Sequence, residues 1–348
     1  MIGRLMRYGG VSGKVRAMHG KRITRDDYAR LIRARGLSEL VAMLKAHPGW
    51  NGALQGISPQ DVHRFELEGA LRRGVDNEYI KIFKFMQGDD AKLMAYRLLR
   101  GEMEELLTFL HYLSAGNPEQ YAYDGTDFFK EHSKVNFDAL PGCRTYAEML
   151  EITRGSIFQD ALREMGRKYG EDLHFAEADV TLRSVFFRRV EKIAEKRYKG
   201  EVFQRIKMAF GTRADMMNIL AIIRIKRHFP EMTSDILSYV VPYYGSLSFD
   251  VIRQLYSAPD EQSLFHTLRQ TSYSKIFSGV DYSYPEQYYY KAIYDFNRAR
   301  ISREIPSVYT PMAYMEIKET ELQNLIYINE CVHYGLSPEA IGTYLIGF

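Results

Sequence analysis

An acid and an amide in the run TRADMMNILAII, which starts at Thr212, are the residues of this chain with the clearest potential for chemistry. Asp215 and Asn218 are three residues apart, so on a helix they lie on one face, along the edge of an apolar stripe. One interpretation is a catalytic pair on a buried helix. The other is a helix start, in which Asp215 favours the positive end of the helix dipole and Thr212 caps the first turn.

The same pattern of an acid, apolar residues and an amide or second acid occurs three times, as EMEELL (102–107), DMMNIL (215–220) and ELQNLI (321–326). A short helix, a turn and an apolar anchor precede each copy, and the anchors are Trp50, Ile157 with Phe158, and Tyr273. An active site is seldom built three times in one chain, so we interpret the acids as helix starts and expect their helices to line a cavity. The candidate positions are Glu102, Glu105, Asp215, Asn218, Glu321 and Asn324.

Other sequence patterns that would support catalysis or cofactor binding are incomplete. The glycine cluster YGGVSGKV (8–15) has Tyr8 and Val15 where a P-loop needs Gly and Ser or Thr. The nine histidines are scattered without helical zinc spacing, and Cys143 and Cys331 form no CxxC pair. We therefore expect no catalytic, cofactor-binding or metal-binding residues.

The bulk composition is that of a globular protein large enough for two or three domains. The chain has 348 residues, 46% hydrophobic content and a net charge of +3, which is too small an excess to indicate a dedicated nucleic-acid binder. Neither a secretory signal nor a run of about 20 apolar residues is present. The sequence predicts a cytoplasmic protein that reaches a membrane only through partners.

Apolar residues recur at intervals of three and four, which predicts an all-α fold. The expected long helices are 59–87, 90–114, 176–209, 211–228, 284–304 and 312–335, with a start near Ser58-Pro59 and a break at Gly200. Together with the repeats, these helices predict three similar domains, at 1–118, 119–233 and 234–348.

Two surface features remain. The first 25 residues contain no acid, and Arg4, Arg7, Lys14 and Arg16 could contact phosphates, acidic lipids or an acidic protein, or form an ordinary solvated helix face. The second is the tyrosine-rich stretch 281–300, which could stack bases or form a protein interface. Its interspersed acids favour the protein interface, and we expect no nucleic-acid partner.

Three segments together resemble the C-type subunit family of archaeal and bacterial V/A-type ATPases, which includes the d-type subunit of the eukaryotic vacuolar ATPase. They are the opening YGGVSGKVRAM with ITRDDYARLIRARGLSELVAML, the central DMMNILAIIRIKRHF, and the C-terminal YMEIKETELQNLIYINECVHYGLSPEAI. The first repeat departs from the family pattern, with Glu105 where the others have Asn.

The resemblance implies three helical domains in a pseudo-threefold arrangement that forms a funnel. It further implies a non-catalytic rotor subunit at the cytoplasmic face of the membrane. Such a subunit would couple central stalk subunits of the D and F type to the proteolipid ring, and transmit torque for proton or sodium transport. The alternatives are a helical scaffold or adaptor unrelated to rotary ATPases and, less favoured, an enzyme with a deep polar pocket.

Overall fold

The computed structural model describes residues 2–170, 174–229, 231, 235–279, 284–303 and 305–348. Over these residues the secondary structure is helical throughout, which confirms the all-α prediction. The chain divides into two compact units, Met1–Met86 with Val280–Phe348 (unit 1) and Gln87–Gly279 (unit 2). The predicted domains 1–118, 119–233 and 234–348, like the funnel, stay predictions.

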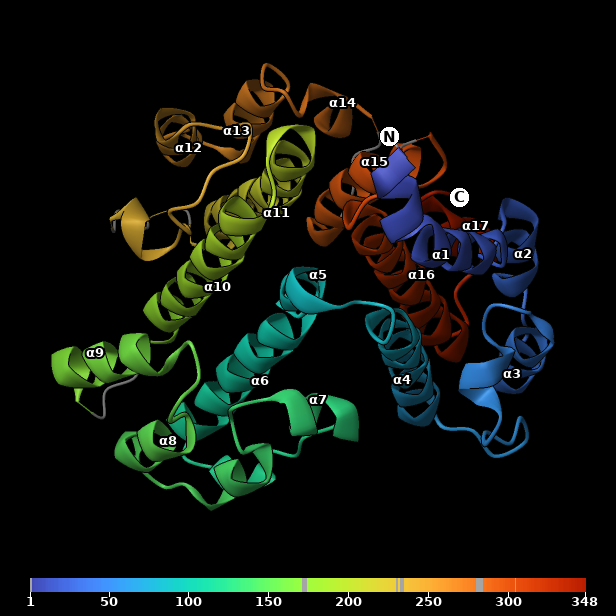
Figure 1. Ribbon diagram of the computed structural model, residues 1–348, viewed down its shortest axis with the longest axis horizontal. Coiled ribbons are helices and arrows are strands. Elements are labelled where there is room, and N and C mark those ends of the chain that lie inside the picture. The colour runs from blue at the N-terminus through green and yellow to red at the C-terminus, as the bar shows by residue number, and fades with distance from the viewer. Residues whose placement is uncertain (1, 171–173, 230, 232–234, 280–283, 304) are drawn as a thin grey trace. The chain divides into compact units, whose positions relative to one another are not determined.

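Unit 1 is assembled from both ends of the chain around one long helix, α16 (Tyr309–His333). α16 packs against α15, α4, α1 and α3, as Figure 1 shows in red and blue. Its core includes the buried side chains of Trp50, Tyr79 and Tyr309. The other elements are α1 (Ile2–Gly20), α2 (Arg25–Leu31), α3 (Leu37–Ala46), the 3-10 helix η1 (Asn51–Leu54), α4 (Arg64–Phe83), α15 (Glu286–Arg303) and α17 (Pro338–Thr343).

Unit 2 is built around α10 (Phe175–Arg197), which packs against α6 (Tyr96–Ser114) and α11 (Gly200–His228) (Figure 1). Phe186, Phe187 and Phe210 contact one another edge to face in its core. The shorter elements are α5 (Gly88–Met94), η2 (Pro118–Gln120), α7 (Asp127–His132), η3 (Phe137–Gly142), α8 (Tyr146–Ile152), α9 (Gln159–Tyr169), η4 (Ile236–Ser238), α12 (Phe249–Tyr256), α13 (Glu261–Leu268) and α14 (Ser274–Phe277). Within the described residues, none of the helices combines the length and hydropathy that a bilayer span requires.

The structure confirms one predicted helix boundary and corrects two others. The predicted break at Gly200 is confirmed, because α10 ends at Arg197 and α11 begins at Gly200, which has a φ of +56°. The predicted division between 209 and 211 is wrong, since α11 continues through that point without interruption. The helix expected to start near Ser58 begins instead at Arg64, because residues 58–63 have no helical conformation.

A capping box begins α2 in unit 1. The Asp27 N–H donates to Thr24 Oγ1 at 3.2 Å, and the Thr24 N–H donates to the Asp27 carboxylate at 2.9 Å. Burial would raise the pKa of Asp27, but the hydrogen bonds from Thr24 and Arg30 outweigh it and lower that pKa from 3.8 to about 2. The carboxylate therefore stabilises the folded state above pH ~4, and this stabilisation is lost as the pH falls toward ~2.

We expect Asp27→Asn to lower the free energy of unfolding by about 1 kcal/mol at pH 7, because the box loses its charged acceptor. The difference between the two proteins should shrink as the pH is lowered to ~3, where the native carboxyl starts to lose its advantage. Urea unfolding at both pH values measures the difference. A difference that grows on acidification would contradict this account of Asp27.

Candidate functional site

The three predicted acids lie in the middle of long helices and not at their starts. Glu102 is in α6, Asp215 in α11 and Glu321 in α16, and all three are buried. The helix-start interpretation is therefore wrong. Since α11 begins at Gly200, Thr212, the expected cap, lies within the helix. Thr212 is also buried.

Asp215 holds a loop of unit 2 against α11. Its carboxylate accepts hydrogen bonds from the backbone N–H groups of Gly245, Ser246 and Leu247 at 2.9, 2.7 and 3.1 Å, and from the Tyr273 hydroxyl at 2.7 Å. Burial raises the pKa of Asp215, although the hydrogen bonds from Gly245 and Tyr273 oppose that rise. The acid acts as an acceptor for the buried Leu247 N–H and for the N–H groups of Gly245 and Ser246, which are exposed residues of the loop.

Asn218 supports the same loop one helical turn later. Its amide oxygen accepts from the Val241 N–H at 2.8 Å, and its amide nitrogen donates to the Val241 carbonyl at 3.0 Å. Both backbone polar groups of Val241 are therefore satisfied by one side chain. Asp215 and Asn218, the pair identified in the sequence, therefore hold the backbone of this loop against α11. The hydrogen bonds to the loop already occupy their buried polar atoms.

Glu321 and Asn324 repeat this arrangement on α16. The Glu321 carboxylate accepts from the Ile23 N–H at 2.9 Å, from Trp50 Nε1 at 2.7 Å and from Lys318 Nζ at 2.9 Å. Asn324 pairs with both backbone groups of Ile346, at 2.9 and 3.0 Å. The acid here holds a segment from the start of the chain, while the amide holds one from its end.

The first copy on α6 is similar but weaker. Glu102 accepts from the Ser133 hydroxyl and from the Lys134 N–H, each at 2.6 Å. Glu105, which stands where the other copies have Asn, accepts from the Tyr121 hydroxyl at 2.6 Å. Among the hydrogen bonds described for Glu105, none pairs with both backbone groups of one residue, as Asn218 and Asn324 do. Burial raises the pKa of Glu105, with the Tyr121 hydrogen bond acting against it.

Two of the anchors donate hydrogen bonds to acids of other copies than the one they precede in the sequence. Tyr273, which precedes the last copy, donates to Asp215 of the second. Trp50 donates to Glu321, the acid of the last copy. Trp50 lies before the first copy in the sequence, yet it bonds to the acid of the last copy. The bonds of Trp50 and Tyr273 therefore cross the predicted domain boundaries.

The basic helix α1 is partly used inside unit 1. Arg16 Nε donates to the Ile301 carbonyl at 3.2 Å, and Lys14 Nζ lies 4.8 Å from the centre of the Phe85 ring. The Arg7 guanidinium stacks over the ring of its neighbour Tyr8 at 5.3 Å. The side chain of Arg4 lies outside the described part of the structure. That this face meets an acidic partner stays a prediction.

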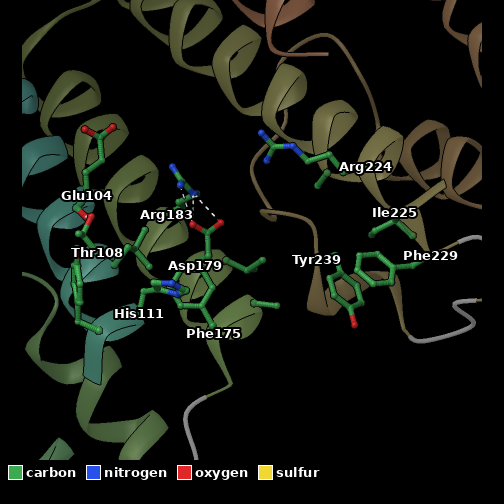
Figure 2. Close-up of a pocket in the computed structure, with 15 residues that line it drawn as sticks. Glu104, Thr108, His111, Phe175, Asp179, Arg183, Arg224, Ile225, Phe229 and Tyr239 are labelled. Carbon is green, nitrogen blue, oxygen red and sulfur yellow. Dashed lines mark hydrogen bonds and ion pairs between the residues drawn. The ribbon is translucent and has the colours of Figure 1, made fainter. Parts of the chain in front are cut away.

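An open groove in unit 2 has the properties of a binding surface (Figure 2). It has a volume of about 770 Å³ and lies along α6, α10 and α11, so two of its walls are the helices that carry Glu102 and Asp215. Its apolar lining includes Leu107, Val180 and Ile225. This surface was not identified from the sequence, because the three faces are brought together only by the packing of the helices.

The rim of the groove carries charges of both signs and exposed aromatic rings. Asp179 and Arg183 form an ion pair at 2.8 Å, and Figure 2 shows them side by side on α10. Phe175 and Phe229 are 41% and 57% exposed, so they add two large apolar side chains to the surface at this groove. An apolar floor with a charged rim suits the binding of another protein segment.

Comparison with known proteins gives one result for the whole chain. A family model described as ATP synthase (C/AC39) subunit matches residues 11–344. No curated protein matches the sequence.

Proposed function

Because the chain belongs to the ATP synthase (C/AC39) subunit family, a family of V/A-type ATPase subunits, we propose that it is a non-catalytic rotor subunit of a rotary ATPase. It couples the central stalk to the membrane proteolipid ring and transmits torque between ATP turnover and ion transport. The observation that carries this proposal is the family match from residue 11 to residue 344. That extent argues against a scaffold unrelated to rotary ATPases.

The braced helices support a mechanical role. In unit 2, Asp215 and Asn218 attach the loop around Val241–Leu247 to α11 by hydrogen bonds to backbone groups. Polar contacts of this kind resist rearrangement, because a bond broken at a buried group such as the Leu247 N–H leaves that group without a partner. A part that transmits torque needs such resistance, and close-packed interiors provide it.

The partners that we propose are the central stalk subunits of the D and F type and the proteolipid ring, so that contact with the membrane is indirect. We assign the groove on α6, α10 and α11 to the stalk. Its apolar floor and exposed Phe175 and Phe229 support a contact with an apolar helix face. The match gives no support to an enzymatic function, and the buried acids are occupied by structural hydrogen bonds.

Cross-linking within the assembled ATPase tests the rotor assignment. If this protein turns with the stalk, a disulfide between the two leaves ATP hydrolysis intact, whereas a disulfide to a stationary subunit stops it. Single-molecule rotation or ATP turnover before and after reduction measures the difference. Hydrolysis that survives attachment to the stationary part would show that the protein does not rotate.

The groove assignment predicts the effect of filling it. Thr108 lines the groove and is exposed, so Thr108→Trp places a large ring there without disturbing the core. We expect the affinity for the purified stalk subunits to fall by about tenfold or more, because the partner must give up contact area. Calorimetric titration of the full chain measures it.

Thr343→Trp is the matched control. Thr343 is also exposed on a helix, and both hydroxyls bond to the carbonyl four residues earlier, at 2.9 Å for Thr108 and 3.0 Å for Thr343. Stalk affinity should stay unchanged in this variant. Equal affinities for both variants would remove the groove from the stalk interface while leaving the family assignment intact.

A further inference from the structure

A second pocket lies in unit 1, in the part of the chain where the sequence is rich in tyrosine. It has a volume of about 610 Å³ and is lined by residues of α15, α16 and the segments beside α17. Residues 281–283 of the tyrosine-rich stretch lie outside the described residues, and Tyr284 and Tyr290 belong to the lining. The volume is in the range of about 300–1,000 Å³ that small-molecule sites occupy.

Aromatic rings dominate this lining, and we call it the tyrosine pocket. Its tyrosines are Tyr284, Tyr290, Tyr327, Tyr334 and Tyr344. The Tyr344 ring lies 5.8 Å from the ring of Tyr284 with the planes at 68°, and 5.8 Å from that of Tyr327 with the planes at 71°. The Tyr344 ring is therefore close to perpendicular to two neighbouring rings of the pocket.

The charges around the tyrosine pocket favour a positively charged ligand. Its charged lining residues are the acids Glu286 and Glu330, and none of the described lining residues is basic. Arg64 pairs with Glu330 at 3.0 Å and lies 5.8 Å from the Tyr334 ring centre. Since Arg64 offsets Glu330 and Glu286 has an interaction of its own, we assign the attraction for a cation to the faces of the rings, as for cations held against aromatic side chains.

We propose that the tyrosine pocket binds a small organic cation with an alkylated ammonium group. The perpendicular rings surround the ammonium head, and the apolar side of the pocket, which includes Ile326 and Leu336, takes the attached carbon chain. A metal ion is a poor fit, because tyrosine rings and aliphatic side chains offer few oxygen ligands.

The test compares choline with 3,3-dimethylbutan-1-ol, which has the same shape without the charge, by NMR titration of the full chain. We expect choline to bind at least about tenfold more tightly. Equal binding would show a merely apolar pocket and overturn the proposal, as would no binding of choline at millimolar concentration.

Two substitutions locate the binding. Tyr327→Leu removes one wall and should weaken choline binding by about tenfold, while Tyr327→Phe keeps the ring and should stay within about threefold of the native protein. Tyr284, which is 58% exposed, gives a second variant, Tyr284→Leu, that does not disturb the core. Binding that survives both leucine variants would overturn the proposal.

Vesicles of phosphatidylcholine distinguish the two sources of such a cation. Co-sedimentation that Tyr327→Leu abolishes identifies a lipid headgroup as the ligand. Binding of free choline without co-sedimentation identifies a soluble amine.

Discussion

Replacing Glu321 by alanine is expected to lower the free energy of unfolding of unit 1 by about 3–5 kcal/mol. The change leaves the Ile23 N–H and Trp50 Nε1 buried without their acceptor. It also removes the nearer of two carboxylates from Lys318, whose side chain is 5% exposed, and leaves Glu78 at 3.6 Å as the other. Loss of one partner of a buried ion pair costs more than loss of the whole pair, because the remaining charge stays desolvated.

Urea unfolding followed by the fluorescence of Trp50, the only tryptophan in the chain, measures this loss of stability. The probe is local, because Trp50 is one of the groups that bond to Glu321. Glu330→Ala is the matched control, since Glu330 is on the same helix and its ion pair with Arg64 is exposed. That pair should contribute less than about 1 kcal/mol. Similar losses in the two variants would contradict the role assigned to Glu321.

Gly211→Ala is expected to destabilise unit 2 by about 2–3 kcal/mol, although alanine is the better helix former. A Cβ atom at Gly211 would lie 2.4 Å from the Cα atom of Gly245, which is backbone and has no side chain to move aside. The Gly245 N–H donates to Asp215 one turn later on the same helix. The methyl group would push the loop away from the acid that holds it.

Gly10→Ala supplies a control with the opposite sign. Gly10 is exposed in α1, and a Cβ atom there would have no neighbour within 4 Å. This variant should gain up to about 1 kcal/mol from helix propensity alone. Thermal unfolding of both variants makes the comparison, and a Gly211→Ala protein as stable as the native one would show that the loop is free to withdraw from α11.

The helices and the important acids could be predicted from the sequence, because both depend on local patterns. Apolar periodicity located the long helices to within a few residues at most ends, and the recurring motif selected Asp215 and Glu321, which prove to be buried braces. The role of Asp215 was misread for a physical reason. A threonine three residues before an acid is typical of a capping box, and only the uninterrupted helix from Gly200 shows that Thr212 caps nothing there.

Long-range pairing was beyond the reach of local patterns. No feature of Trp50 itself indicates that its indole N–H donates to Glu321, and the proximity of the short loops to their acids depends on the packing of whole helices. The groove and the tyrosine pocket could not be predicted for the same reason. The tyrosines near residue 290 were conspicuous in the sequence, but their relation to Tyr327 and Tyr344 arises only when α15 and α16 lie together.

The make-up of unit 1 has a consequence for how the chain matures on the ribosome. Residues 1–86 are translated before unit 2, yet α16 and the acid that receives Ile23 and Trp50 are translated after it. Unit 2, encoded wholly between them, has all its segments available earlier. The contacts of Ile23 and Trp50 with Glu321 can therefore form only after unit 2 has been synthesised.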